Sequence, residues 1–290
     1  MGTKVIVHGG CFPCPPWHGL KEIPLKQPSI YLPHGGGPCF FMDPPSDEPD
    51  RWVAMEAYLR SLPDRLPGRP DALLVISAHW EKSRPTVLSS ARPGLLFDYY
   101  GFPANTYHLT WPAPGAPALA SRVRALLASA GIESDEDASR DYDHGVFIPL
   151  KVAFPDADIP VLQLSLQAGL DPARHIAIGR AIKSLRDENV AILGSGLSFH
   201  NLRAFGDPRA IAPAVDFDRW LTEVLCDGPI GERELELAQW SQAPGARICH
   251  PREEHLLPLM VAAGAASGEP GHHAFQGTIW GMAVSAYHFG

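Results

Sequence analysis

The sequence has little charge and no concentration of it. Only 19% of its 290 residues are charged, and 24 Lys and Arg against 32 Asp and Glu give a formal net charge of −8. Because no block of like charges occurs, we expect neither nucleic acid nor a membrane as partner. No apolar run reaches the length of a membrane span. The apolar stretch at residues 1–6 is too short for a secretory signal, and Ile6 stands where myristoylation needs Ser or Thr. We therefore expect a cytoplasmic protein.

Cysteine is also scarce. Five Cys, an odd number, do not predict a disulfide framework. The pair Cys11 and Cys14 has no second CxxC that would complete a zinc site. Three other residue types are abundant: the chain has 30 Pro, 27 Gly and 13 His. Proline and glycine predict many irregular loops. Histidine is the commonest metal ligand and the side chain best suited to proton transfer near neutral pH.

Strand and helix patterns alternate along the chain, and 45% of its residues are apolar. Short apolar runs predict strands at residues 29–32, 72–77, 161–166, 190–193, 278–279 and 283–288. Helical periodicity predicts helices at residues 51–62 with Asp50 as N-cap, 117–130, 171–188 with Pro172 at the first turn, 215–226 and 253–263. This alternation predicts an α/β fold with a single domain, in which helices flank both faces of a mainly parallel central sheet.

Three histidines follow predicted strands. His34 follows residues 29–32 and precedes three glycines, His79 follows residues 72–77, and His200 follows residues 190–193 through a short loop. Ligands of open α/β sheets bind at the carboxyl ends of the strands. A single histidine there is usually structural, but three predict a site at this edge. The loop between residues 193 and 200 contains Gly-Ser-Gly, which lacks the spacing of a nucleotide-binding motif.

Two more histidines complete the candidate site. His144 follows Asp143, which could orient its ring, and His255 lies at the start of the predicted helix 253–263. Three imidazoles that leave open positions suit Zn²⁺ or non-haem Fe(II), and spacing alone does not choose between them. Residues 97–111 are rich in aromatic residues and proline, which fits either core packing or the wall of an aromatic pocket.

Several longer motifs resemble one known family, the class III extradiol ring-cleavage dioxygenases of the DOPA 4,5-dioxygenase type. They run in the family's order from about residue 29 to residue 290. The motifs are YLPHGGGP (31–38), VISAHWE (75–81), YYGFP (99–103), WPAPG (111–115), DHG (143–145), PDADIPV (155–161), GSG (194–196), HNL (200–202) and EHLLPL (254–259). The resemblance implies a catalytic domain over residues 29–290 and leaves residues 1–28 as an N-terminal extension.

The resemblance also implies roles for the five histidines. His34, His79 and His255 correspond to the metal ligands. His200 corresponds to the active-site base and is a candidate fourth ligand, and His144 corresponds to a second acid/base. Some members of the wider superfamily use two histidines and one carboxylate, so the adjacent Glu253 and Glu254 leave a carboxylate ligand open.

The implied activity is Fe(II)-dependent extradiol cleavage of a DOPA-like catechol by O₂, which yields a ring-opened semialdehyde. Fe(2+) is expected for activity, and Zn(2+) is possible in purified protein, because the Irving–Williams order favours zinc over Fe(II). Two alternatives stay open: a Zn-dependent hydrolase on the same scaffold, and a non-enzymatic relative like the Memo proteins. The sequence indicates neither the particular catechol or aminophenol, nor the ring bond cleaved, nor the oligomeric state.

Overall fold

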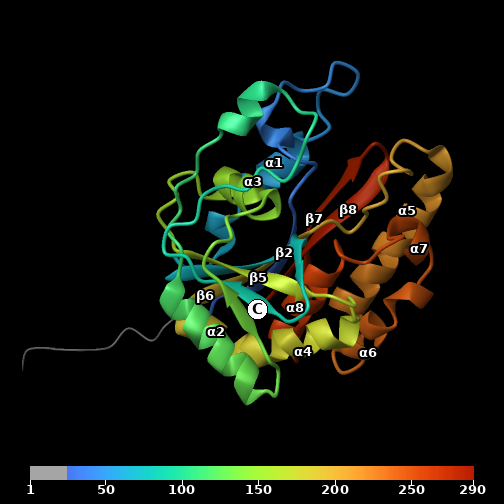
Figure 1. The fold of residues 1–290 in the computed structure, drawn as a ribbon. Coiled ribbons are helices and arrows are strands. Elements are labelled where there is room, and N and C mark those ends of the chain that lie inside the picture. The colour runs from blue at the N-terminus through green and yellow to red at the C-terminus, as the bar shows by residue number, and fades with distance from the viewer. Residues whose placement is uncertain (1–24) are drawn as a thin grey trace, which may run out of the picture.

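A computed structural model describes residues 25–290, built around one eight-stranded sheet in the order β4-β3-β5-β2-β6-β1-β8-β7 (Figure 1). The strands are β1 (Ser29–Pro33), β2 (Ala72–Lys82), β3 (Thr86–Leu88), β4 (Asp135–Asp137), β5 (Val161–Gln167), β6 (Val190–Gly196), β7 (Gly271–Ile279) and β8 (Met282–Phe289). The central strands β5, β2, β6 and β1 are parallel to one another. The outer strands β8 and β3 run antiparallel to their inner neighbours. The predicted single α/β domain with a mainly parallel sheet is confirmed.

Helices cover both faces of this sheet. They are α1 (Val53–Arg60), α2 (Pro117–Ser129), α3 (His144–Ala153), α4 (Pro172–Ile182), α5 (Pro208–Thr222), α6 (Arg233–Ala238), α7 (Ala246–Cys249) and α8 (Leu257–Ala265). Figure 1 shows α1 and α3 on one side of the sheet and α2, α4 and α8 on the other. Successive residues of β6 face opposite sides, as the pleat requires. Gly194 packs against Pro258 in the first turn of α8 and Gly196 against His255 just before it, whereas the Ser195 hydroxyl donates to the Gly145 carbonyl of α3.

The central strand β2 is longer than its sequence predicts. It continues to Lys82, and its pairing with β5 shifts register between Ile76 and Glu81. His79 therefore lies inside a bulged strand and not beyond its end, which corrects the prediction. Polar residues interrupt the apolar run after Ser77, so periodicity alone ended the strand too early. The bulge re-aims side chains near the end of the strand.

Several helix boundaries also differ from the prediction. Helix α5 begins at Pro208, where the side chain of Asp207 accepts from the backbone N–H of Arg209. Asp50 is not the N-cap of α1: it gives only its backbone carbonyl, which accepts from Val53 at 3.1 Å. Helix α8 begins at Leu257, so the predicted start at residue 253 is wrong. Helix α3 was not predicted because nearly all of it is buried, and it therefore lacks an amphipathic pattern.

The predicted extension at residues 1–28 lies mostly outside the described residues. Near its end, Gln27 is buried and its backbone N–H donates to the Arg186 carbonyl at 2.9 Å. Across the described part of the chain, no helix is long and apolar enough to cross a membrane.

Candidate active site

Five histidines line one cavity at the edge of the sheet where the parallel strands end. The turn after β1 carries His34, and the bulged part of β2 carries His79. His144 is the first residue of α3, His200 follows β6, and His255 lies in the turn before α8. The cavity has a volume of about 700 Å³. The structure thus brings together all five histidines that the sequence singled out.

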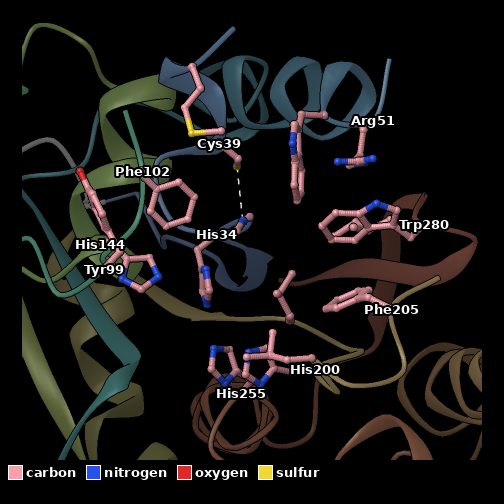
Figure 2. Close-up of a pocket in the computed structure, with 18 of the residues that line it drawn as sticks. His34, Cys39, Arg51, Tyr99, Phe102, His144, His200, Phe205, His255 and Trp280 are labelled. Carbon is pink, nitrogen blue, oxygen red and sulfur yellow. Dashed lines mark hydrogen bonds between the residues drawn. The ribbon is translucent and has the colours of Figure 1, made fainter. Parts of the chain in front are cut away.

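Their rings converge closely. The Nε2 atoms of His34 and His79 lie 3.3 Å apart. The ring centroids of His79 and His144 are 3.9 Å apart, and those of His34 and His255 are 5.2 Å apart. The rings of His200 and His255 stack at 3.3 Å between centroids. Both residues lie next to each other in the lower part of Figure 2. One nitrogen each from His34, His79 and His144 lies within 4.8 Å of the others, and a second such group joins His200 and His255 to Glu254.

The donor set fits a divalent transition metal. Within residues 25–290, His34 Nδ1 and His255 Nε2 are buried without a hydrogen-bond partner. Buried polar atoms normally have a partner, so His255 Nε2 is available to a ligand, and His34 has an unpartnered Nδ1 besides the Nε2 that faces His79. Burial, reinforced by neighbouring histidines, lowers the pKa of His34 and His79 well below the usual value, and burial lowers the pKa of His255 to about 3. The three rings are therefore neutral at pH 7, which is the form that binds metals.

A carboxylate that the sequence analysis missed holds His144. Asp98 Oδ1 accepts from both the backbone N–H and the ring Nδ1 of His144, at 2.9 and 2.8 Å. Its other oxygen lies 3.9 Å from Nδ1 of His79. Asp98 is one acidic residue within the aromatic segment 97–111, and no local motif marks it.

Asp143, which the sequence offered as the orienting group for a ring, does not have that role. It is fully buried and its carboxylate accepts from Ser77 Oγ at 2.7 Å, from Arg140 at 2.9 Å and from Gln163. The Ser77 hydroxyl in turn accepts from the backbone N–H of His79 at 3.2 Å. Asp143 therefore ties the start of α3 to the bulged strand that carries His79.

The segment that carries His255 is fixed from three directions. Tyr31 donates its hydroxyl to the His255 carbonyl at 2.8 Å, and the backbone N–H of Leu197 donates to the same carbonyl at 3.2 Å. The absence of a side chain at Gly196 lets β6 approach this carbonyl, because a Cβ there would overlap it. The Gly-Ser-Gly sequence is therefore explained by close packing against the site.

The two glutamates next to His255 face different ways. Glu253 pairs with Arg247 at 2.8 Å, away from the histidines. Glu254 turns inward, and its Oε1 lies 2.9 Å from His255 Nδ1 and 3.2 Å from His200 Nδ1.

Aromatic side chains form much of the cavity wall. They are Trp52, Tyr99, Phe102, Phe205 and Trp280, and Figure 2 shows Tyr99 and Phe102 beside His144 and Phe205 and Trp280 on the opposite side. Two of them come from the aromatic segment 97–111, which supports its interpretation as a pocket wall. Among the lining residues that the structure describes, Arg51 is the one Arg or Lys; its guanidinium lies 4.1 Å from the Trp280 ring centroid and 2.7 Å from Glu48. The arrangement suits a flat aromatic ligand held over metal-binding imidazoles.

Comparison with known proteins identifies the family. Residues 28–287 match the family described as the catalytic LigB subunit of aromatic ring-opening dioxygenase. The chain belongs to the LigB family. It is 37% identical over 250 residues to a 4,5-DOPA dioxygenase extradiol of Portulaca grandiflora, covering 84% of this chain and 88% of the relative. It is 36% identical over 288 residues to Dioxygenase tasH of Hapsidospora irregularis, covering 91% of this chain and 85% of the relative.

A solved structure agrees with this assignment. An uncharacterized protein of Escherichia coli K12 superimposes with a TM-score of 0.71 at 28% sequence identity, covering 91% of this chain and all of that one. The resemblance carried by the sequence motifs is thus confirmed. This LigB-family protein is an extradiol aromatic ring-opening dioxygenase, an enzyme that uses O₂ and a small aromatic substrate, and its family depends on a metal.

Proposed function

We propose that this dioxygenase uses Fe(II) and O₂ to open the ring of a catechol similar to DOPA, and that it forms a ring-opened semialdehyde. The observation that carries the proposal is the convergence of neutral, partly unpartnered imidazoles at the floor of an aromatic cavity. Several relatives with 34–41% identity bear the name 4,5-DOPA dioxygenase extradiol, which supports a catechol as substrate.

The proposed metal ligands are His34, His79 and His255. His34 and His79 already turn their Nε2 atoms toward each other, and the Nε2 of His255 is buried and free of other partners. His144 also places its Nδ1 on a carboxylate, Asp98, so the choice of His255 as the third ligand rests on the resemblance of the EHLLPL motif and not on this contact. The three proposed ligands would hold Fe(II), which would supply open coordination positions for the two catechol oxygens and for O₂. Zn²⁺ would bind the same donors and compete in purified protein.

The remaining histidines would move protons. His200 lines the cavity and is the proposed base, which accepts the proton of the second catechol hydroxyl. Its Nδ1 faces Glu254, and a carboxylate there stabilises the imidazolium that forms. His144, with its Nδ1 on Asp98, is the proposed acid that returns a proton during ring opening. Each such step is typically worth roughly 10²–10⁴-fold in rate.

The aromatic walls would position the ring. Trp52, Phe102 and Trp280 line the cavity together with the histidines, so they would hold the flat ring of a catechol while its oxygens face the metal ligands. Holding the catechol in one orientation raises the reaction rate, because the substrate then meets the catalytic groups in a fixed geometry. We further propose that residues 29–290 form the catalytic domain, that residues 1–28 are an extension, and that the enzyme works in the cytoplasm.

Anaerobic reconstitution tests the proposal. Apoprotein is loaded with Fe(II) or with Zn²⁺, and oxygen uptake is measured with a panel of catechols and aminophenols. We expect uptake with at least one catechol in the Fe(II) form only, together with a new absorbance from the ring-opened product. Absence of uptake, with ester or amide hydrolysis in the Zn²⁺ form, would instead support the hydrolase alternative. Neither that alternative nor a non-enzymatic Memo-like role is favoured by the relatives found.

A further inference from the structure

One carboxylate contacts two histidines that have different proposed roles. Glu254 Oε1 lies 2.9 Å from Nδ1 of His255 and 3.2 Å from Nδ1 of His200. The two rings stack at 3.3 Å with only 17° between their planes, so both present the same edge to this oxygen. The same oxygen is the hydrogen-bond partner of His255 Nδ1 and the charged neighbour of His200 Nδ1.

The contact decides which ring nitrogen carries the proton. A carboxylate only accepts hydrogen bonds, so a neutral imidazole beside it must place its proton on Nδ1. Nε2 then has a free lone pair. For His255 that atom is the buried nitrogen without a partner, and for His200 it is the nitrogen remote from Glu254. A free Nε2 is what a metal ligand and a general base each require.

Glu254 is itself held in place. Its second oxygen accepts from Arg252 at 3.3 Å, and Arg252 also forms two hydrogen bonds with Glu81 at the end of β2, at 2.6 and 2.7 Å. Glu254 is thus anchored, through Arg252 and Glu81, to the strand that carries His79.

We propose that Glu254 is a positioning residue that holds both His255 and His200 in the Nδ1–H tautomer, so that one carboxylate prepares the metal ligand and the base together. The assignment of ligand and base rests on the proposed function, whereas the tautomers follow from the Glu254 contacts alone. A histidine side chain in water is not held in the Nδ1–H tautomer, so the carboxylate of Glu254 must impose this tautomer on the two rings.

The first experiment reads the tautomers in the metal-free protein. Long-range ¹H–¹⁵N NMR correlations distinguish Nδ1–H from Nε2–H, and the signals of His200 and His255 are assigned by comparison with H200A and H255A. We expect Nδ1–H for both rings in the wild-type chain. In Glu254→Ala both rings should populate Nε2–H, whereas Glu253→Ala should leave them unchanged, because Glu253 pairs with Arg247 outside the cavity.

The second experiment measures Zn²⁺ affinity by competition with a chelator. We expect Glu254→Ala to weaken binding about 10–100-fold, the usual effect of losing the partner of a ligating histidine. Glu253→Ala is the matched control and should stay within threefold of wild type. Should Glu254→Ala fail to fold, Glu254→Asp keeps the charge but withdraws it by one methylene, and the same tautomer change is expected.

The outcomes separate the two proposals. If Glu254→Ala keeps Nδ1–H on both rings and binds Zn²⁺ like wild type, the positioning role is wrong, whatever the enzyme turns over. If no catechol is consumed but both measurements change as described, the positioning role stands and the proposed substrate fails. A change in His255 alone would contradict the shared role of the carboxylate.

Discussion

Replacing Gly196 by alanine should damage the metal site through the backbone alone. Gly196 is at the end of β6, and a Cβ at this position would overlap the carbonyl oxygen of His255. That carbonyl cannot retreat freely, because it accepts hydrogen bonds from Tyr31 and Leu197. The new methyl group must therefore push the backbone of the proposed ligand His255 out of place.

The loss of stability in Gly196→Ala can be worked out from these contacts. Forcing an extra methyl group into a close-packed site usually destabilises a protein by about 1–3 kcal/mol. Weakening the two hydrogen bonds to the His255 carbonyl adds about 1 kcal/mol for each bond lost. If both bonds are lost, we expect a total loss of about 3–5 kcal/mol in the free energy of unfolding. Because a ligand displaced by about 1 Å no longer meets the metal well, we also expect Zn²⁺ affinity to fall at least tenfold.

Gly194 supplies a matched control in the same strand. It faces the same side of the sheet, but a Cβ at Gly194 would overlap the carbonyl of Pro258, inside α8 and beyond the ligand. Gly194→Ala should therefore lose similar stability in urea unfolding and keep its metal affinity. Equal loss of affinity in both variants, or no change in Gly196→Ala, would refute the argument that Gly196 acts through the His255 backbone.

Three further substitutions test the site and its scaffold. His255→Ala should remove most bound metal from the purified protein, and near-full occupancy by elemental analysis would transfer the ligand role to another side chain. His200→Ala should keep the metal content near stoichiometric while the turnover rate falls by roughly 10²–10⁴-fold. Higher pH should recover part of this rate, because catechol then deprotonates without a base. If the variant also loses its metal, His200 is a fourth ligand. Glu269→Ala removes the charge partner of the fully buried Arg186 guanidinium, which Glu269 contacts at 2.9 Å through both oxygens. The guanidinium keeps its hydrogen bonds to the carbonyls of Gln27, Ala265 and Phe289, so we expect a loss of about 1.5–3 kcal/mol at pH 7 by urea unfolding. Burial raises the pKa of Glu269, but the hydrogen bonds from Arg186 and Lys26 outweigh burial and lower that pKa below its usual value. The stabilisation by Glu269 is therefore present above the unfolded-state pKa of about 4.3 and disappears as the pH falls through the folded-state pKa. A loss of stability in Glu269→Ala that is the same at pH 3 as at pH 7 would contradict this prediction.

The sequence predicts the sheet well where apolar runs are long and uninterrupted. The strands at residues 29–32, 161–166 and 190–193 were each predicted within a few residues of the observed ends. Buried parallel strands need apolar side chains on both faces, so their signal is continuous and strong. The gathering of histidines was predictable for the same reason, because parallel strands bring their carboxyl ends to one edge.

Other features depend on contacts that no local pattern records. Strands β3 and β4 have three residues each, too few for a periodic signal. The start of α3 at His144 was hidden because a helix buried on every side has no polar face. The choice of Asp98 over Asp143 as partner of His144 depends on where residues 97–111 fold back, which spacing along the chain does not reveal.

The hydrogen bond between Tyr31 and the His255 carbonyl joins residues 224 positions apart. During synthesis the chain emerges from its amino end, so β1 and His34 leave the ribosome long before the turn that carries His255. A growing chain that stops short of residue 255 presents four of the five histidines without the segment that closes the cavity. Loading of the complete site with metal must therefore follow translation of almost the whole domain.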